Sequence, residues 1–345
     1  MFVSGNNPVG GGQPNSIETS YVQMYRDGFE QAYQQSVSIL DPYVERESQR
    51  GEFQYWDRIG EAEEMREDVT RYGDNPVSEI DHDRRRIDLR SFELGKYIDP
   101  KDLKRVASDP QNPYSQALLA SGNRKRDDFI IERYFGPAYT GKGGESVINY
   151  CTSASDTEGE TITVGEKSNG SSNPITATAG RYTLKAGDFE GISVGSKFVL
   201  SGTAAKTGLT LAKLKALRTT MLRLEAINQD TVLNAFLSSA QFENLLGIEE
   251  IINSDYAVRK SLAEGQVTTY MGYRFILTER LPLVGDERRC VVSLPRALKL
   301  AVGEELKGDL WRDSSKKNIP YIHFKQMIGG SRMWGEIAGE IRCVE

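Results

Sequence analysis

The stretch "DPQNPYSQALLASGNRKRDDFIIERYFG", residues 109–136, predicts a long α-helix. Asn112 is a suitable N-cap, Pro113 suits the first helical position and Gly136 follows the end of the pattern. The predicted helix, residues 113–135, has about six turns at 3.6 residues per turn. It separates a charged N-terminal part from a C-terminal part in which strand patterns dominate.

The segment before this helix, residues 46–98, is the most charged part of the chain. It contains 14 Asp or Glu and 10 Lys or Arg among 53 residues, which is too dense for a core of its own. Its two ends, "GEFQYWDRIG" and "RRRIDLRS", alternate between polar and apolar residues like strands. We therefore expect a long β-hairpin with a charged tip.

The N-terminal arm, residues 1–45, begins with a stretch rich in Gly, Asn and Pro, and we expect residues 1–19 to be flexible. From residue 20 onward, apolar side chains recur at steps of three and four, which predicts a helix with one apolar face that needs a partner surface. The aromatic residues of this face are Tyr21, Tyr25, Phe29 and Tyr33.

The region after the long helix predicts small strands and few helices. Residues 145–206 are rich in Gly, Ser and Thr, with short strand patterns such as "RYTLKAG" and "KFVLSG", and we expect an inserted surface lobe. A second helix begins near Thr210. Further strands are predicted at "TVLNAFLSS", "QVTTYMGYRFILTE", "RRCVVSL" and "SRMWGEIAGEIRCVE", and short helices at "AQFENLL" and "PRALKLAVG". The fold class is α+β.

Composition excludes several classes. The chain has 345 residues and a formal net charge of -6, so its mean field repels DNA and acidic lipid. No apolar run reaches the roughly 18 residues of a membrane span, and we expect a soluble cytosolic protein when it is made. The cysteines, which suggest neither a disulfide framework nor a zinc site and are expected to be buried or idle, are Cys151, Cys290 and Cys343.

Candidate chemistry is sparse. The stretch "GPAYTGKGG" resembles a phosphate-binding loop, but Gly143 stands where the loop needs Ser or Thr, so we interpret it as a turn. His82 and His323 are far apart in sequence, and no nucleophile motif accompanies them. We expect no catalytic residue, no metal and no cofactor, although an unrecognised carboxylate site in a hydrolytic enzyme stays open.

The arginine triplet in the returning strand, "DHDRRRIDLRSFE", suggests nucleic acid at first sight. Residues 81–93, however, contain four Arg and four Asp or Glu, so their local charge is zero. Strand alternation sends Arg84 and Arg86 to one face and Arg85 to the other. Ion pairs across a subunit interface are the favoured interpretation, ahead of a solvated hairpin and of a nucleic-acid site. The expected contact residues are Arg84, Arg85, Arg86, Arg90, Asp57, Arg58 and Trp56.

Lysine is unevenly distributed, and this favours the interface. The first 95 residues contain 10 Arg and no Lys, whereas the rest of the chain contains 16 Arg and 17 Lys. Arginine is enriched and lysine depleted at protein interfaces, because the planar guanidinium binds carboxylates with two hydrogen bonds. The bias lies in the arm and the hairpin, the parts that least resemble an independent domain.

The order of these features resembles the major capsid proteins of tailed bacteriophages, which have the Hong Kong 97 type of fold. The stretch "RRRIDLRSFELGKYIDPKDLKRVASDPQNPY" and the late strand "GYRFILTERLP" look most like the capsid proteins of short-tailed phages, and "RKRDDFII" and "YTGKGGE" fit the same pattern. The resemblance covers residues 20–345 except for about 145–206.

The resemblance implies a division of the chain into five parts. These are an N-terminal arm, residues 1–45; an extended loop that lies over a neighbour, residues 46–98; a peripheral β domain with the spine helix, residues 99–206; an axial sheet-and-helix domain, residues 207–325; and closing strands that return to the peripheral domain, residues 326–345. Some relatives join a lysine of the extended loop to a neighbour's asparagine. Residues 46–95 contain no lysine, so we expect a shell without covalent cross-links.

The function implied is self-assembly, through pentamers and hexamers, into an icosahedral virion shell around double-stranded DNA that is enclosed but not read. The implied partners are portal, scaffolding and decoration proteins. Assembly is expected in the cytoplasm of the bacterial host, without a membrane. The alternatives are an encapsulin-like compartment of the same fold and the hydrolytic enzyme mentioned above.

Overall fold

The computed structural model describes residues 35–60, 67, 77, 79–80, 82–98, 111–150, 162–164, 175–178, 181–184, 192–194, 198–202, 208–223, 225–247 and 269–345. Most of the helix expected in the N-terminal arm lies outside these residues, and it stays a prediction. The charged tip of the hairpin also lies mostly outside them. The described elements confirm an α+β fold. They divide into two compact units, of which the first contains Phe92–Arg124 and Leu306–Gln326 and the second contains Ser38–Ser91, Lys125–Glu305 and Met327–Glu345.

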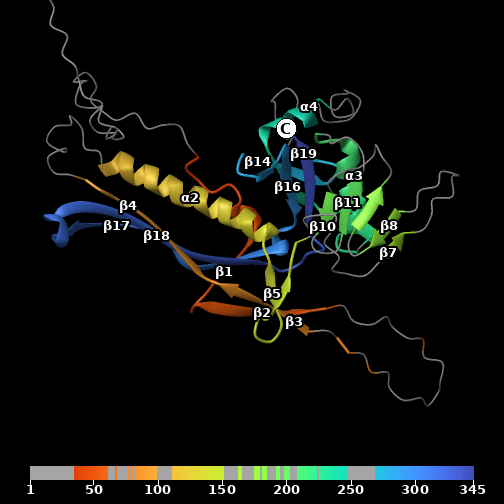
Figure 1. The fold of residues 1–345 in the computed structure, drawn as a ribbon, viewed down its shortest axis with the longest axis horizontal. Coiled ribbons are helices and arrows are strands. Elements are labelled where there is room, and N and C mark those ends of the chain that lie inside the picture. Colours follow the sequence, from red (N-terminus) through yellow and green to blue (C-terminus); the bar gives the residue numbers. More distant parts are fainter. Residues whose placement is uncertain are drawn as a thin grey trace, which may run out of the picture. The chain divides into compact units, whose positions relative to one another are not determined.

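The long helix α2, Gln111–Phe135, confirms the prediction and begins two residues before the expected start (Figure 1). In its C-terminal half Phe129, Ile130 and Tyr134 are buried, so core packing stabilises this half. The helix ends at Phe135, and an added Cβ on the following residue, Gly136, would lie 2.8 Å from the carbonyl oxygen of Glu132. Glycine is therefore required at this end.

The predicted charged hairpin is confirmed by strands β2, Phe53–Ile59, and β3, His82–Asp88. The two strands are antiparallel, with Trp56 opposite Arg85. Two short strands that follow α2, namely β5, Ala138–Thr140, and β6, Ser146–Ile148, complete a four-stranded sheet in the order β2-β3-β5-β6. The hairpin is thus anchored to the chain segment that follows the long helix.

A second, longer hairpin was not predicted. Strands β17, Leu298–Asp313, and β18, Ile319–Arg332, lie side by side between β1, Glu45–Ser48, and β4, Arg90–Tyr97 (Figure 1). The helix predicted at "PRALKLAVG" is wrong, because only a 3-10 turn, Pro295–Ala297, precedes β17. The residues that follow alternate at the strand period, with Leu298 and Leu300 buried, and β1 pairs with this part of β17.

The largest sheet has 11 strands and includes the predicted C-terminal strands. Its order is β13-β14-β12-β16-β19-β10-β11-β9-β8-β7, with β15 paired to β16. The members are β7 Ile162–Val164, β8 Ile175–Thr178, β9 Arg181–Leu184, β10 Ile192–Val194, β11 Phe198–Gly202, β12 Leu233–Leu237, β13 Thr269–Tyr270, β14 Tyr273–Leu277, β15 Leu283–Val284, β16 Glu287–Ser293 and β19 Ala338–Val344. The described strands β7 to β11 of the Gly/Ser/Thr-rich segment therefore continue this sheet through the pairing of β10 with β19, rather than forming a sheet of their own.

Two helices accompany the sheet, α3, Leu211–Arg223, and α4, Ser239–Leu246, and both were predicted. Leu217 and Met221 of α3 are buried against β19, where Gly339 leaves room for them: an added Cβ would lie 2.8 Å from each side chain. The close approach of the helix to the sheet thus depends on this glycine.

Candidate subunit interface

The β2–β3 hairpin has two faces of different character. Its inner face contributes Trp56 and Ile87 to a small core with Ala301 and Met333. Because side chains alternate along a strand, the residues between them point to the outer face. The outer face carries Phe53, Tyr55, Asp57 and Ile59 from β2 and Arg84 and Arg86 from β3.

Arg85 lies on the inner face and is 3% exposed. Its Nη1 donates to Asp83 Oδ2 at 2.7 Å, and Arg58 Nε donates to the same oxygen at 2.9 Å. Thr140 of β5 donates to the other carboxylate oxygen. The buried charge is therefore compensated within its own chain, as buried ions require.

The pKa of Asp83 reflects this arrangement. Burial alone raises the pKa, but the hydrogen bond from Thr140 and the charges of Arg85 and Arg58 outweigh it, so the pKa lies below its ordinary value. A carboxyl whose pKa is lowered by folding stabilises the folded state above its unfolded pKa, and this contribution is lost as the pH falls through the folded pKa.

We expect Asp83→Asn to be less stable than the wild type at neutral pH, because the neutral amide removes the carboxylate with which Arg58 and Arg85 form ion pairs. The difference in the free energy of unfolding should narrow as the pH falls below about 4, where an unfolded Asp is protonated. Denaturant titrations at several pH values measure it. A difference that stays constant down to the acid transition would contradict the role of this carboxylate.

The outer face carries arginines whose guanidinium groups lie over aromatic rings. Arg84 Nε donates to Asp57 at 3.0 Å, and its guanidinium carbon lies 5.6 Å from the ring centre of Tyr55. Arg86 Nε donates to Asp88 at 2.8 Å, and its guanidinium carbon lies 5.0 Å from the ring centre of Phe53. Aromatic and arginine side chains are the residues that interfaces favour.

The outer face is also more apolar than an ordinary solvated hairpin. Phe53 is 49% exposed and Ile59 is 59% exposed. The sequence indicated that Arg84 and Arg86 share a face, and it assigned Arg85 to the other face; the structure places all three accordingly. Arg90, another predicted contact, pairs with Glu132 of α2 at 3.1 Å. The predicted arm contacts lie outside the described residues.

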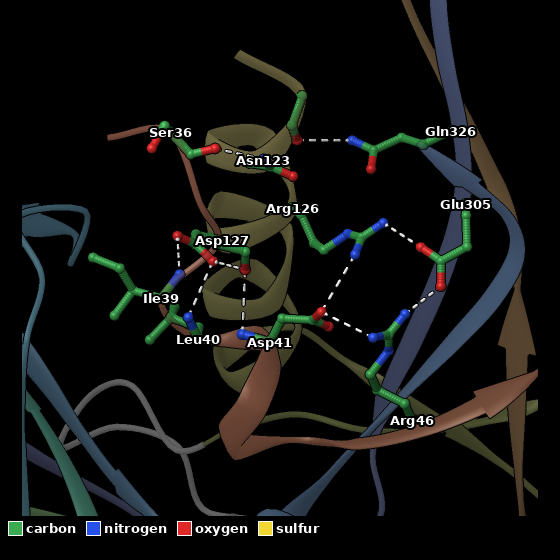
Figure 2. A network of polar contacts seen from close by, with 12 residues as sticks. Ser36, Ile39, Leu40, Asp41, Arg46, Asn123, Arg126, Asp127, Glu305 and Gln326 are labelled. Carbon is green, nitrogen blue, oxygen red and sulfur yellow. Dashed lines mark hydrogen bonds and ion pairs between the residues drawn. The ribbon is translucent and has the colours of Figure 1, made fainter. Parts of the chain in front are cut away.

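Sequence reasoning did not find a polar network between α2 and the segment that leads into β1, which Figure 2 shows. Asp127 of α2 is fully buried, and its carboxylate accepts hydrogen bonds from the backbone N–H groups of Ile39, at 3.0 Å, and Leu40, at 3.2 Å. The hydroxyl of Ser38 donates to it as well. One helical carboxylate thus fixes the segment that leads into β1, and the only signal in the sequence is a charged run inside the helix.

The neighbouring residue of α2, Arg126, binds carboxylates on two other segments (Figure 2). It contacts Asp41 at 3.3 Å and Glu305 of β17 at 2.9 Å. Arg46 of β1 pairs with both of these carboxylates. Two arginines and two carboxylates alternate, so the charges cancel, and the segment before the hairpin is tied to both α2 and β17.

A family model described as phage capsid protein matches residues 17–345 of this sequence. The chain belongs to the phage capsid protein family. It is therefore a structural protein of the virion, the major capsid protein that forms the head shell. No curated protein is similar to it in sequence at a significant level.

Solved capsids share the fold of this capsid protein at low sequence identity. The capsid of cyanophage P-SCSP1u is 12% identical, with 99% of each chain covered and a TM-score of 0.62. The capsid of cyanophage Pam1 is 13% identical, with 93% of this chain and 95% of that chain covered and a TM-score of 0.61. The capsid of Ralstonia phage GP4 is 12% identical, with 98% of this chain and 97% of that chain covered and a TM-score of 0.58. The fold is the Hong Kong 97-like capsid fold.

The buried carboxylate of the capsid protein's large sheet is paired rather than poised for acid–base work. Glu340 is fully buried and accepts two hydrogen bonds from Arg289, at 2.6 and 2.9 Å, and one from Arg342, at 3.0 Å. Paired in this way, it serves as an internal counter-ion between β16 and β19. Within the described residues, no group of three His, Cys, Asp or Glu is placed to hold a metal ion.

Cys290 and Cys343 of the capsid protein are free and buried, as the sequence predicted, and Cys151 lies outside the described residues. A hydrogen bond with Cys343, together with burial, raises the pKa of the Cys290 thiol. It is therefore protonated at neutral pH and unsuited to nucleophilic chemistry. Among the helices of the described part, none is long and apolar enough to cross a membrane.

Proposed function

We propose that this capsid protein associates with copies of itself, as pentamers and hexamers, into an icosahedral shell that encloses double-stranded DNA, and that it does so without catalysis. The observation that carries the proposal is the exposed outer face of the β2–β3 hairpin. Its aromatic and arginine side chains already make ion pairs and ring contacts within the chain, which lowers the side-chain freedom that is lost when a neighbour covers them.

The hairpin belongs to the extended loop, residues 46–98, and in this proposal it lies over a neighbouring subunit. Arg84, Arg86 and Asp57 contact that neighbour from the outer face. Arg85, Arg58 and Trp56 support the contact from the inner face, where they are buried or half-buried. Arg90 acts at the base of the loop through Glu132.

The other parts receive their roles from the same proposal. Helix α2 is the spine of the subunit, and residues 207–325 form the axial domain around the fivefold and sixfold centres. The N-terminal arm contributes a second contact, through its aromatic face of Tyr21, Tyr25, Phe29 and Tyr33. The shell is assembled in the cytoplasm of the bacterial host with portal and scaffolding proteins, and it offers a surface for decoration proteins.

The enclosed DNA is not read by sequence in this proposal. The net charge of -6 supports this, because a negatively charged container repels its cargo and leaves it free for release. The zero net charge of residues 81–93 also leaves the arginine triplet without the positive excess that phosphate binding needs.

We expect the purified protein to form closed particles hundreds of ångströms across in electron micrographs. We also expect these shells to dissolve into single chains in denaturing electrophoresis, with or without reductant, because residues 46–95 contain no lysine to form an isopeptide bond. Soluble monomers under all assembly conditions would contradict the shell. A ladder of multimers that survives reduction would contradict only the prediction that the contacts are non-covalent, and the shell itself would stand.

A further inference from the structure

The C-terminal end of helix α2 is covered by an arginine from a strand. Arg332, the last residue of β18, is 3% exposed. Its Nη1 donates to the carbonyl oxygens of Tyr134, at 2.7 Å, and Gly136, at 3.0 Å. The last carbonyl groups of a helix have no partner within the helix and carry a partial negative charge. Arg332 therefore caps α2 with both a donor and a positive charge.

The same guanidinium reaches the sheet that contains the β2–β3 hairpin. Nη2 of Arg332 donates to the carbonyl oxygen of Ile148, the last residue of β6, at 3.2 Å. The guanidinium carbon lies 5.0 Å from the ring centre of Tyr150, and this ring meets Phe135 of α2 edge-on, with 5.4 Å between the ring centres. One side chain thus joins the end of α2 to the sheet β2-β3-β5-β6.

Arg332 remains charged in this buried position. Burial lowers the pKa of Arg332 to about 10, so the guanidinium is protonated at neutral pH. A buried charge needs hydrogen bonds in place of the lost water, and the three carbonyl oxygens supply them. The guanidinium is planar, and its donors point in fixed directions. Two chain segments that bind one guanidinium are therefore held at a fixed position relative to each other.

The two residues that follow Arg332 contact the hairpin directly. Met333 is 3% exposed and packs with Trp56 of β2 in the core beneath the hairpin. Its carbonyl oxygen accepts a hydrogen bond from Nη1 of Arg58, at 2.6 Å. The guanidinium carbon of Arg58 also lies 4.8 Å from the ring centre of Trp334. Three consecutive residues therefore support the hairpin on its inner face.

The hairpin extends beyond the place where the rest of its sheet supports it. Strand β5 pairs with β3 at Arg85 and Arg86. The last described pair of the hairpin, Ile59 with His82, lies three residues beyond Arg85, or about 10 Å. A rotation of about 10° at Arg85 would move this pair by about 2 Å, whereas a binding surface has to be held to about 0.5 Å. The direction of the hairpin therefore depends on how firmly its supports are held.

We propose that Arg332 is a positioning residue for shell assembly, which fixes the direction of the β2–β3 hairpin and thereby the angle between neighbouring subunits. The inference rests on the proposed shell, in which the outer face of this hairpin contacts a neighbour. Arg332 is itself buried, so it acts through the hairpin sheet. A closed symmetric assembly repeats its contact geometry at every subunit, and a hairpin of variable direction therefore gives shells of variable size.

Two substitutions of Arg332 and one matched control test this role. Arg332→Lys keeps the charge but lacks the planar fork that binds two segments at once, and Arg332→Met keeps an apolar chain without any donor. The control, Tyr134→Phe, removes the buried hydrogen bond with Ser293, at 2.8 Å, and so loosens α2 from β16 without a change in the hairpin sheet. Electron microscopy measures the particle diameters. Hydrogen exchange of β3 and β5 and thermal unfolding are measured on unassembled subunits.

We expect shells of the wild-type diameter to become about tenfold rarer in both Arg332 variants, with particles of other diameters in their place, and the amides of β3 and β5 to exchange faster. The control should keep the wild-type diameter at a comparable loss of thermal stability. Wild-type diameters or unchanged exchange in both Arg332 variants would overturn the proposal. So would altered diameters in the control, or an Arg332→Lys subunit that does not fold, since either result assigns Arg332 to stability alone. Absence of particles from the wild type would instead refute the shell itself.

Discussion

The double variant Arg84→Glu with Arg86→Glu is expected to lose shell assembly while its subunit stays folded. Both side chains lie on the outer face, and their partners, Asp57 and Asp88, are exposed. Exposed ion pairs contribute at most about 1 kcal/mol each, so the subunit tolerates the loss. The reversal, however, removes two arginines from each hairpin and places new carboxylates beside Asp57 and Asp88, and the effect recurs at every contact. A loss of about 1.4 kcal/mol at each contact already weakens association tenfold.

The measurement compares particle yield by electron microscopy with the thermal unfolding of unassembled subunits. The variant Arg84→Lys with Arg86→Lys should be intermediate, because lysine keeps the charge but loses the planar fork. Normal shells from the Glu variant would refute the outer face as a contact. An unfolded subunit would instead mean that these arginines stabilise the fold.

Replacement of Asp127 by alanine is expected to lower the free energy of unfolding by about 3 kcal/mol or more. The carboxylate accepts from the backbone N–H groups of Ile39 and Leu40 and from the hydroxyl of Ser38. Alanine leaves these donors without that acceptor at a buried position, and an unsatisfied buried group costs about 1–3 kcal/mol. The segment that leads into β1 would then lose its attachment to α2.

The next residue offers a matched control for this variant. Asp128 pairs with Arg280 at 2.6 Å, but its side chain is 41% exposed. Asp128→Ala should therefore cost no more than about 1 kcal/mol. Denaturant unfolding of both variants gives the comparison, with hydrogen exchange at residues 39–40 as a local probe. Equal losses of stability for the two variants, or unchanged hydrogen exchange in Asp127→Ala, would contradict the role of Asp127 in attaching this segment to α2.

The elements with strong local signals could be predicted from the sequence. The helix after Pro113 had a start, a stop and a helical pattern, and the strands around Trp56 and Arg85 had clear alternation. Even the opposite facing of Arg85 and its two neighbours follows from strand geometry alone. These features depend on residues that are close together along the chain.

The features that were missed depend on contacts between distant residues. The stretch after Pro295 has helix-forming Ala, Leu and Lys, but it becomes a strand because β1 and β18 pair with it. Asp127 looked like one more charge of "RKRDD", because its acceptor role arises only when a segment almost 90 residues away reaches α2. The burial of Arg85 could not be predicted for the same reason. Its counter-charge, Asp83, accepts a hydrogen bond from Thr140, which lies in β5, after helix α2 in the sequence.

The place of β19 in the large sheet has a consequence for biosynthesis. This strand, residues 338–344, lies between β16 and β10, which it pairs on its two sides. Among the described strands, β19 joins the part of the sheet made from residues 162–202 to the part made from residues 233–293. This link forms only after residues 338–344 have been synthesised. A folding intermediate in which β19 has not yet paired therefore holds the large sheet as two separate parts.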